Sequence, residues 1–170
     1  MLAIVGVIVG AIWYSAETVN NDILVEETMK DILQIARGSQ RLFPVGAYPT
    51  VTNTMTAASN SALKAGVIPS NYQYVSATAR AKSPLGVEVF VGLGCYSYCP
   101  QLGVAVMGRV DTALCNQLIR RIASKFTDNS DLLYIQVTSS PMQFYYLPLN
   151  LTTVNCPSSV TDIYFWFKPS

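Results

Sequence analysis

The 170-residue chain contains no histidine, and only 12% of its residues are charged, about half the ~25% of an average soluble domain. The missing histidine removes the commonest general base and the commonest metal ligand. The ten acidic residues are scattered and form no pair suited to acid–base catalysis. We therefore expect no enzymatic activity, no metal site and no cofactor.

A surplus of charge of either sign is also absent. The net charge is +1, which argues against nucleic acid or an anionic membrane surface as the main partner, because both attract dense Lys/Arg patches. The nearest thing to a basic cluster is Arg120, Arg121 and Lys125, whose helical spacing predicts a solvated helix face. Residues 1–41 carry a net −2 and the remainder a net +3. The two parts could complement each other between copies of the chain, although chance scatter gives the same pattern.

The chain opens with fourteen residues that include neither a charge nor a proline. An amphipathic stretch follows at about 17–40, and Gly38 and Pro44 mark its end. One helix over residues 1–40 would be roughly 60 Å long at ~1.5 Å per residue. Such a helix projects from the head domain expected at 41–170. The apolar stripe predicted to pack on that domain's sheet is Val25, Met29, Ile32, Leu33 and Ala36.

Three interpretations of residues 1–14 compete. A signal peptide would need a basic start and an A-x-A-like cleavage site, and neither is present. A single-pass anchor needs ~20 apolar residues, and this run is shorter. The third interpretation is a stem that lies in a membrane before assembly and packs against identical stems in a filament core afterwards, with Gly6 and Gly10 allowing close approach. The predicted core-packing residues are Met1, Leu2, Ile4, Val5, Gly6, Val7, Ile8, Val9, Gly10, Ile12 and Trp13.

The rest of the sequence indicates an α+β domain on an antiparallel sheet. A Pro/Gly loop at 42–52 precedes a short helix at about 53–66. Strands are expected from about residue 72, including 87–94 and 102–110 on either side of a hairpin-like turn at 95–101. A helix over 113–126 is capped by Asp111-Thr112. The last expected strands are 131–140, a possible edge strand 142–149 and a closing strand 160–167.

Four cysteines allow three complete disulfide pairings. Cys95 and Cys99 flank a short turn and are candidates for each other, which leaves Cys115 with Cys156. The second bridge would stabilise the fold by ~4 kcal/mol in the chain-entropy model. Two disulfides imply an oxidising compartment. The alternatives are a four-cysteine zinc site, whose spacing lacks a second close pair, and four buried free thiols.

Two further motifs are weaker. Asn150-Leu151-Thr152 is a glycosylation sequon of a kind that chance also produces. The aromatic residues near the end of the chain are typical of sheet faces, with core packing preferred over carbohydrate or surface binding. They are Tyr145, Tyr146, Tyr164, Phe165, Trp166 and Phe167.

The order of these elements resembles a type IV pilin of the b subclass, close to the pilins of bundle-forming and conjugative thin pili. The resemblance depends on the N-terminal helix, on GAYPT (46–50), on NSALKAGVIPSNY (60–72), and on ALCNQLI (113–119) with VNC (154–156). It implies the type IV pilin-like fold, and it also implies that Cys115–Cys156 is the family's C-terminal disulfide. The family usually has a glutamate a few residues into the mature chain, whereas no acid precedes Glu17 here. Either the mature chain has residues before Met1, or this pilin lacks that glutamate.

The resemblance implies a major pilin that polymerises through its apolar helix into an extracellular pilus on a bacterial surface. Such pili mediate cell–cell or surface contact, including conjugation. The implied partners are identical subunits and the inner-membrane assembly machinery, with the stem in the inner membrane and the head in the periplasm before assembly. Two alternatives remain: a minor pilin or pseudopilin, and a monomeric membrane-anchored, disulfide-bonded binding domain.

Overall fold

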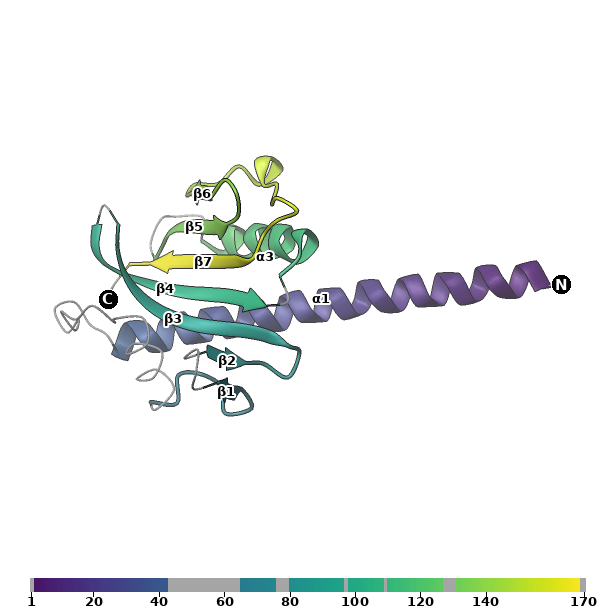
Figure 1. The fold of residues 1–170 in the computed structure, drawn as a ribbon, viewed down its shortest axis with the longest axis horizontal. Helices are drawn as coiled ribbons and strands as arrows, with labels where there is room; N and C mark the ends of the chain where they lie inside the picture. The colour runs from purple at the N-terminus through teal and green to yellow at the C-terminus, as the bar shows by residue number, and fades with distance from the viewer. Residues whose placement is uncertain are drawn as a thin grey trace.

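The described residues form a long N-terminal helix, a shorter helix later in the chain and a seven-stranded antiparallel sheet, which confirms the α+β class (Figure 1). The structure is a computed structural model. It describes residues 2–42, 65–75, 80–96, 98–108, 110–126 and 131–168. Side chains are not described for residues 2–12, 14, 17, 18, 93–96 and 98–100. The short helix expected at 53–66 lies mostly outside the described residues.

Helix α1 spans Leu2–Leu42 and has 41 residues. No proline interrupts it, so its hydrogen-bond ladder is continuous from the apolar run into the amphipathic stretch. Its C-terminal part lies against the sheet, and its N-terminal part extends beyond the rest of the molecule (Figure 1). Among the described residues, no helix combines the length and hydropathy needed to cross a membrane.

The strands form one sheet in the order β1-β2-β3-β4-β7-β5-β6, and every pairing is antiparallel. Their bounds are Gln73–Val75 (β1), Arg80–Lys82 (β2), Val87–Tyr96 (β3), Tyr98–Gly108 (β4), Leu132–Thr138 (β5), Gln143–Tyr146 (β6) and Asp162–Phe167 (β7). The possible edge strand β6 does lie at an edge. The closing strand β7 lies inside the sheet, between β4 and β5, so the end of the chain completes the central layer.

The turn expected at 95–101 was wrong in extent. Strand β3 continues to Tyr96, and β4 begins at Tyr98, with a register shift between Gly94 and Tyr96. Tyrosines favour strands, so the ladder extends through residues whose cysteines and proline suggested a turn. Cys95 and Cys99 therefore lie in the two strands of a long hairpin.

Helix α3 spans Thr112–Lys125 and begins as the sequence predicted. The Asp111 side chain accepts a hydrogen bond from the Leu114 N–H at 2.7 Å, which satisfies one of the free amides of the first turn. A short 3-10 turn, η1 (Leu151–Thr153), is capped in the same way by Asn150 of the sequon. The sequon is therefore part of a structured turn.

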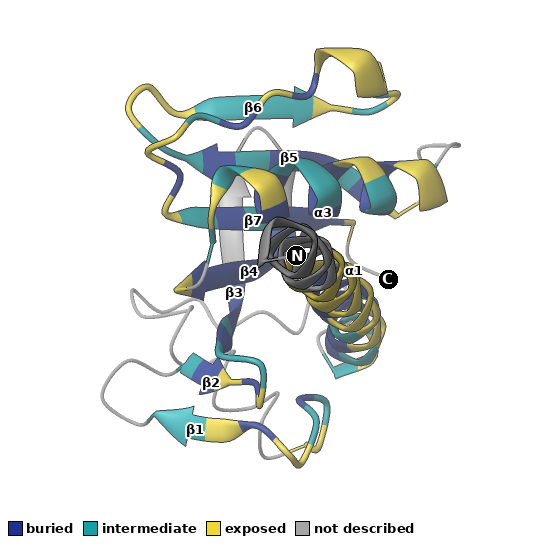
Figure 2. Ribbon diagram, turned by 90° about the vertical axis from the view of Figure 1, so that its right-hand side faces the viewer, coloured by how far each residue is buried: buried dark blue, intermediate teal, exposed yellow. Residues whose placement is uncertain are grey.

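The core lies between the sheet and helices α1 and α3, which cover the same face of the sheet (Figure 2). Helix α1 packs against β3, β4 and α3. Strand β7 shows the alternation that a half-covered sheet requires: Ile163, Phe165 and Phe167 belong to the core beneath the helices. Tyr164 lies with Phe90, Ala105 and Met107 in a separate cluster. The aromatic side chains of β7 therefore pack on both faces of the sheet.

Candidate interaction surface

Helix α1 consists of two parts with different surroundings. We call residues 2–23 the outer half and residues 24–42 the inner half. In the outer half, Trp13 is 74% exposed, Val19 58% and Ile23 47%. The backbone of the outer half is helical. The other predicted filament-core residues are Met1, which is not described, and Leu2, Ile4, Val5, Gly6, Val7, Ile8, Val9, Gly10 and Ile12, whose side chains are not described.

The inner half contains the predicted packing stripe. Val25, Met29, Ile32 and Ala36 are buried, and Leu33 is partly buried against the same core. Helix α3 is a second partner of this stripe that the pattern did not indicate. The periodicity predicted which side chains of the helix are buried. It could not predict whether a sheet or another helix covers them.

Tyr72 connects the inner half to the segment before β1. Its hydroxyl donates a hydrogen bond to the Asp31 carboxylate, and its ring is buried in the core. Burial, together with the bond and the charge of Asp31, raises the pKa of the Tyr72 hydroxyl well above its usual range. The neutral phenol is therefore the stable form in the folded chain.

The boundary between the two halves is held by Arg121 of α3. Its Nη2 lies 2.9 Å from Asp22 Oδ1, and its Nη1 lies 3.0 Å from Glu26 Oε2. The predicted solvated face of α3 is therefore only partly free. Arg120 also donates to the Val154 carbonyl at 3.2 Å. The Arg121 pairings depend on how α1 crosses α3, and the Arg120 bond on where the loop at Val154 lies, so a local charge pattern could not reveal them.

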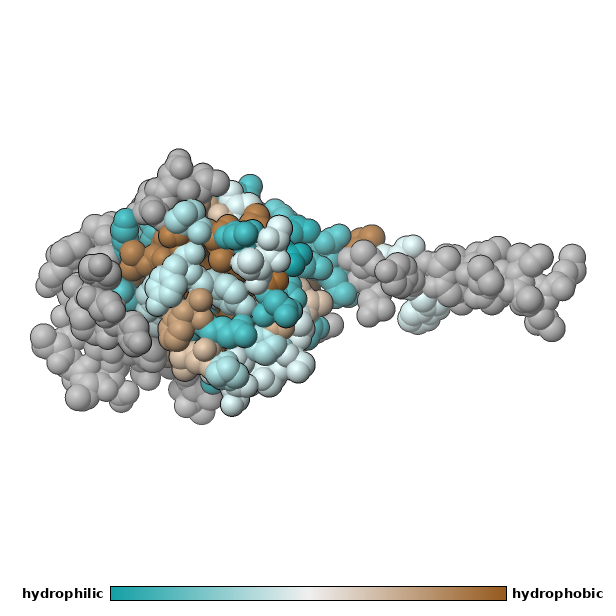
Figure 3. All heavy atoms as spheres, turned by 90° about the horizontal axis from the view of Figure 1, so that it is seen from above, coloured by the Kyte–Doolittle hydropathy of each residue, from teal (hydrophilic) through white to brown (hydrophobic). Residues whose placement is uncertain are grey.

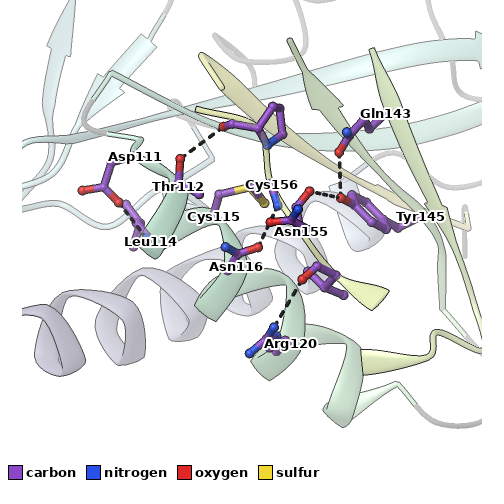
Figure 4. The surroundings of a disulfide bond; sticks show 12 residues. Asp111, Thr112, Leu114, Cys115, Asn116, Arg120, Gln143, Tyr145, Asn155 and Cys156 are labelled. Carbon is purple, nitrogen blue, oxygen red and sulfur yellow. Dashed lines mark hydrogen bonds between the residues drawn. A yellow bond between two sulfur atoms is a disulfide. The ribbon is translucent and has the colours of Figure 1, made fainter. Parts of the chain in front are cut away.

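A disulfide joins Cys115 of α3 to Cys156, as predicted, and both residues are buried (Figure 4). Hydrogen bonds hold the same loop on α3: the Cys156 N–H donates to Asn116 Oδ1 at 2.8 Å, and Thr112 Oγ1 donates to the Pro157 carbonyl at 3.2 Å. The side chains of Cys95 and Cys99 lie outside the described part, so their pairing remains a prediction.

The outer face of the sheet carries a row of aromatic rings. Tyr146, Tyr134, Trp166 and Tyr164 follow one another with ring centroids 5.7 to 6.1 Å apart. Trp166 lies over Gly103, where any Cβ would come within 3.0 Å of the ring. Burial, more than the nearby Asp162, raises the pKa of Tyr164. The alternation of Tyr164 and Trp166 with Phe165 and Phe167 was the sequence signal for this row.

Tyr134 reaches that row because of a β-bulge. Leu132 pairs with Phe167 and Tyr134 with Trp166, with a register shift between them. The extra residue turns Leu132 to the core and Tyr134 to the outer face. The buried polar groups in the row are satisfied: Tyr134 donates to Gln101 Oε1 at 3.0 Å, and Trp166 Nε1 donates to Gln136 Oε1 at 3.1 Å.

The described residues include no cluster of candidate metal ligands. No group of three or more Cys, Asp or Glu side chains in the described ranges could hold a metal ion. The grooves near α1 are lined by mixed apolar and charged residues. On the face seen in Figure 3, hydrophobic and hydrophilic residues of the body lie interspersed. The large exposed apolar side chains of the outer half are therefore the most distinctive surface.

Comparisons of the chain with protein-family models, with curated proteins and with solved structures found no match.

Proposed function

We propose that this chain is the structural subunit of a type IVb pilus-like filament, and that it assembles through the outer half of α1. The observation that carries the proposal is the contrast along one helix. The inner half is buried in its own domain, while Trp13, Val19 and Ile23 of the outer half are exposed. The uncharged run 1–14 continues that apolar surface in the sequence.

Burial physics supports a polymer as the partner. Apolar surface removed from water contributes roughly 25 cal/mol per Å², and a projecting helix can reach that burial only against another molecule. A contact in which one copy's stem meets a different surface of the next copy propagates into an open filament. Before assembly, membrane lipid would bury the same side chains. In this proposal the stem lies in the inner membrane with the head in the periplasm, and the filament is extracellular.

The disulfide supports the same placement. Cys115–Cys156 joins two buried residues across 41 positions, and such bonds persist in oxidising compartments such as the periplasm and the cell exterior. The resemblance in element order to type IVb pilins points the same way. In this proposal the head has no enzymatic role, and cell–cell or surface contact is the function of the filament.

Electron microscopy of filaments sheared from cells that produce the chain tests the proposal. Val7→Asp places a charge in the apolar run, and we expect filaments to be lost while the head stays folded. Met142→Asp is the matched control, because Met142 is an exposed apolar residue of the body (49%), and we expect it to assemble normally. Wild-type cells without filaments, or a Val7→Asp chain that assembles as well as wild type, would contradict the proposal.

A further inference from the structure

The solvent-facing side of α1 carries two adjoining blocks of opposite charge. The acidic block is Asp22, Glu26 and Glu27, and the basic block is Lys30, Arg37 and Arg41. All six residues are exposed. The acid between the basic positions, Asp31, accepts the hydrogen bond from Tyr72.

Helix geometry places both blocks on the same side. At about 100° per residue, Lys30, Arg37 and Arg41 fall within about 40° of one another. The same geometry spreads Asp22, Glu26 and Glu27 over about 140° around that direction, with Asp22 nearest to the buried stripe. A neighbouring molecule that lies along this side of α1 would therefore contact the acidic block nearer the N-terminus and the basic block nearer the C-terminus.

The basic block lines a surface groove together with Leu33, Gly66 and Val67. Within the part of the chain that the structure describes, none of the three basic side chains forms an ion pair. The groove thus presents cationic groups over a partly apolar floor.

Local effects account for only part of this separation of charge. The helix macrodipole favours acids in the first turn and bases in the last, and its influence fades beyond those turns. It therefore explains Arg41 but not the block boundary between Glu27 and Lys30, in the interior of a 41-residue helix. Opposite charges at spacings of three and four stabilise a helix, and Lys30 has those spacings from Glu27 and Glu26. Arg37 and Arg41 have no acid three or four residues before them, so such pairs do not explain their positions.

We propose that the basic groove of one chain binds the acidic block of α1 of a second copy, in parallel and staggered along the helix axis. The centres of the two blocks are about 11 residues apart, so the stagger is about 17 Å at ~1.5 Å per residue. Asp22 and Glu26 remain 54% and 60% exposed beside Arg121. Their carboxylates keep free acceptor positions for a second cation. The inference rests on the proposed filament and specifies one contact within it.

In the proposed filament each chain binds one neighbour through its basic groove and another through its acidic block. Reversing the charge of either block should therefore prevent assembly. Arg37→Glu with Arg41→Glu should lower filament yield at least tenfold, and so should Glu26→Lys with Glu27→Lys. The matched control is Lys82→Glu with Lys125→Glu, which changes the net charge as much as the first pair at exposed positions outside the groove. We expect this control to assemble like wild type. Thermal unfolding of each head verifies that the variants are folded.

Mixing the two reversed chains gives the decisive measurement. The intact groove of one variant faces the intact acids of the other, and the two reversed blocks also complement each other. We expect alternating filaments from co-producing cells, although neither chain assembles alone. Wild-type filament yield from either reversed chain would overturn the contact, and so would folded variants that fail to assemble together. If either result overturns the contact but wild-type cells still form filaments, the proposed function is unaffected. If wild-type cells form no filaments, the proposed function itself is refuted.

Discussion

The inner half of α1 packs into the core of its own domain, whereas the apolar side chains described in the outer half, Trp13, Val19 and Ile23, are exposed. Ile32, Ile35 and Ala36 are at most 2% exposed in the inner half, and Trp13 is 74% exposed in the outer half. Most helical stability in proteins comes from packing of an apolar face. The exposed apolar residues of the outer half are therefore the observation on which the proposed filament contact rests.

Matched substitutions in the two halves should give the largest difference. Ile32 is fully buried and Ile23 is 47% exposed. Ile32→Asn leaves an amide without partners in the core, and we expect it to lower the free energy of unfolding by about 4 kcal/mol or more. Ile23→Asn should change it by less than about 1 kcal/mol. Urea unfolding of both variants measures this, and equal losses would mean that the halves do not differ as described.

The disulfide stabilises α3, the helix that the inner half packs against. Replacing Cys115 and Cys156 by serine removes a 41-residue cross-link, which the chain-entropy model values at ~4 kcal/mol. We expect a loss of about 2–4 kcal/mol, measured by urea unfolding under non-reducing conditions. Non-reduced peptide mapping of the wild-type chain provides the check on pairing, and a link from Cys115 to Cys95 would refute the assignment.

Alkaline pH tests how firmly Tyr72 secures the inner half. Its pKa in the folded chain lies above the ordinary 10.0, so above pH 10 the folded chain keeps a proton that the unfolded chain loses. Stability should therefore fall as pH rises above about 10, by up to about 1.4 kcal/mol per pH unit from this group.

Tyr72→Phe removes that contribution, so we expect urea unfolding to weaken less steeply between pH 10 and 11. The slope should become shallower without vanishing, because burial also raises the pKa of Tyr145 and Tyr164. Tyr146→Phe, at a position 60% exposed, is the control. An unchanged slope in Tyr72→Phe would show that the hydroxyl titrates as readily in the folded chain as in the unfolded one.

Local sequence signals predicted the parts of the fold that depend on short-range patterns. The stripe of the inner half follows from a period of 3.6, and the start of α3 follows from Asp111 as a cap. The disulfide followed from assigning the two nearest cysteines to each other, although only the Cys115–Cys156 half of that assignment is described.

Features that depend on how distant elements meet could not be predicted in this way. The Tyr72–Asp31 bond joins residues 41 positions apart, and Arg121 reaches Glu26 across 95 positions. The bulge that turns Tyr134 outward depends on the register between β5 and β7. No single segment encodes that register.

The smallest effect concerns the boundary itself. Arg121 bridges α3 to Asp22 and Glu26, but its side chain is 39% exposed and the acids are more so. Exposed ion pairs contribute about 0–1 kcal/mol. Arg121→Ala should therefore lower the free energy of unfolding by at most about 1 kcal/mol, and 0.5 M salt should reduce the difference because it screens exposed charges. Urea unfolding at two salt concentrations measures both. A loss above 2 kcal/mol that persists at high salt would mean that Arg121 is a structural anchor of α1, and that the boundary between the halves belongs to the core.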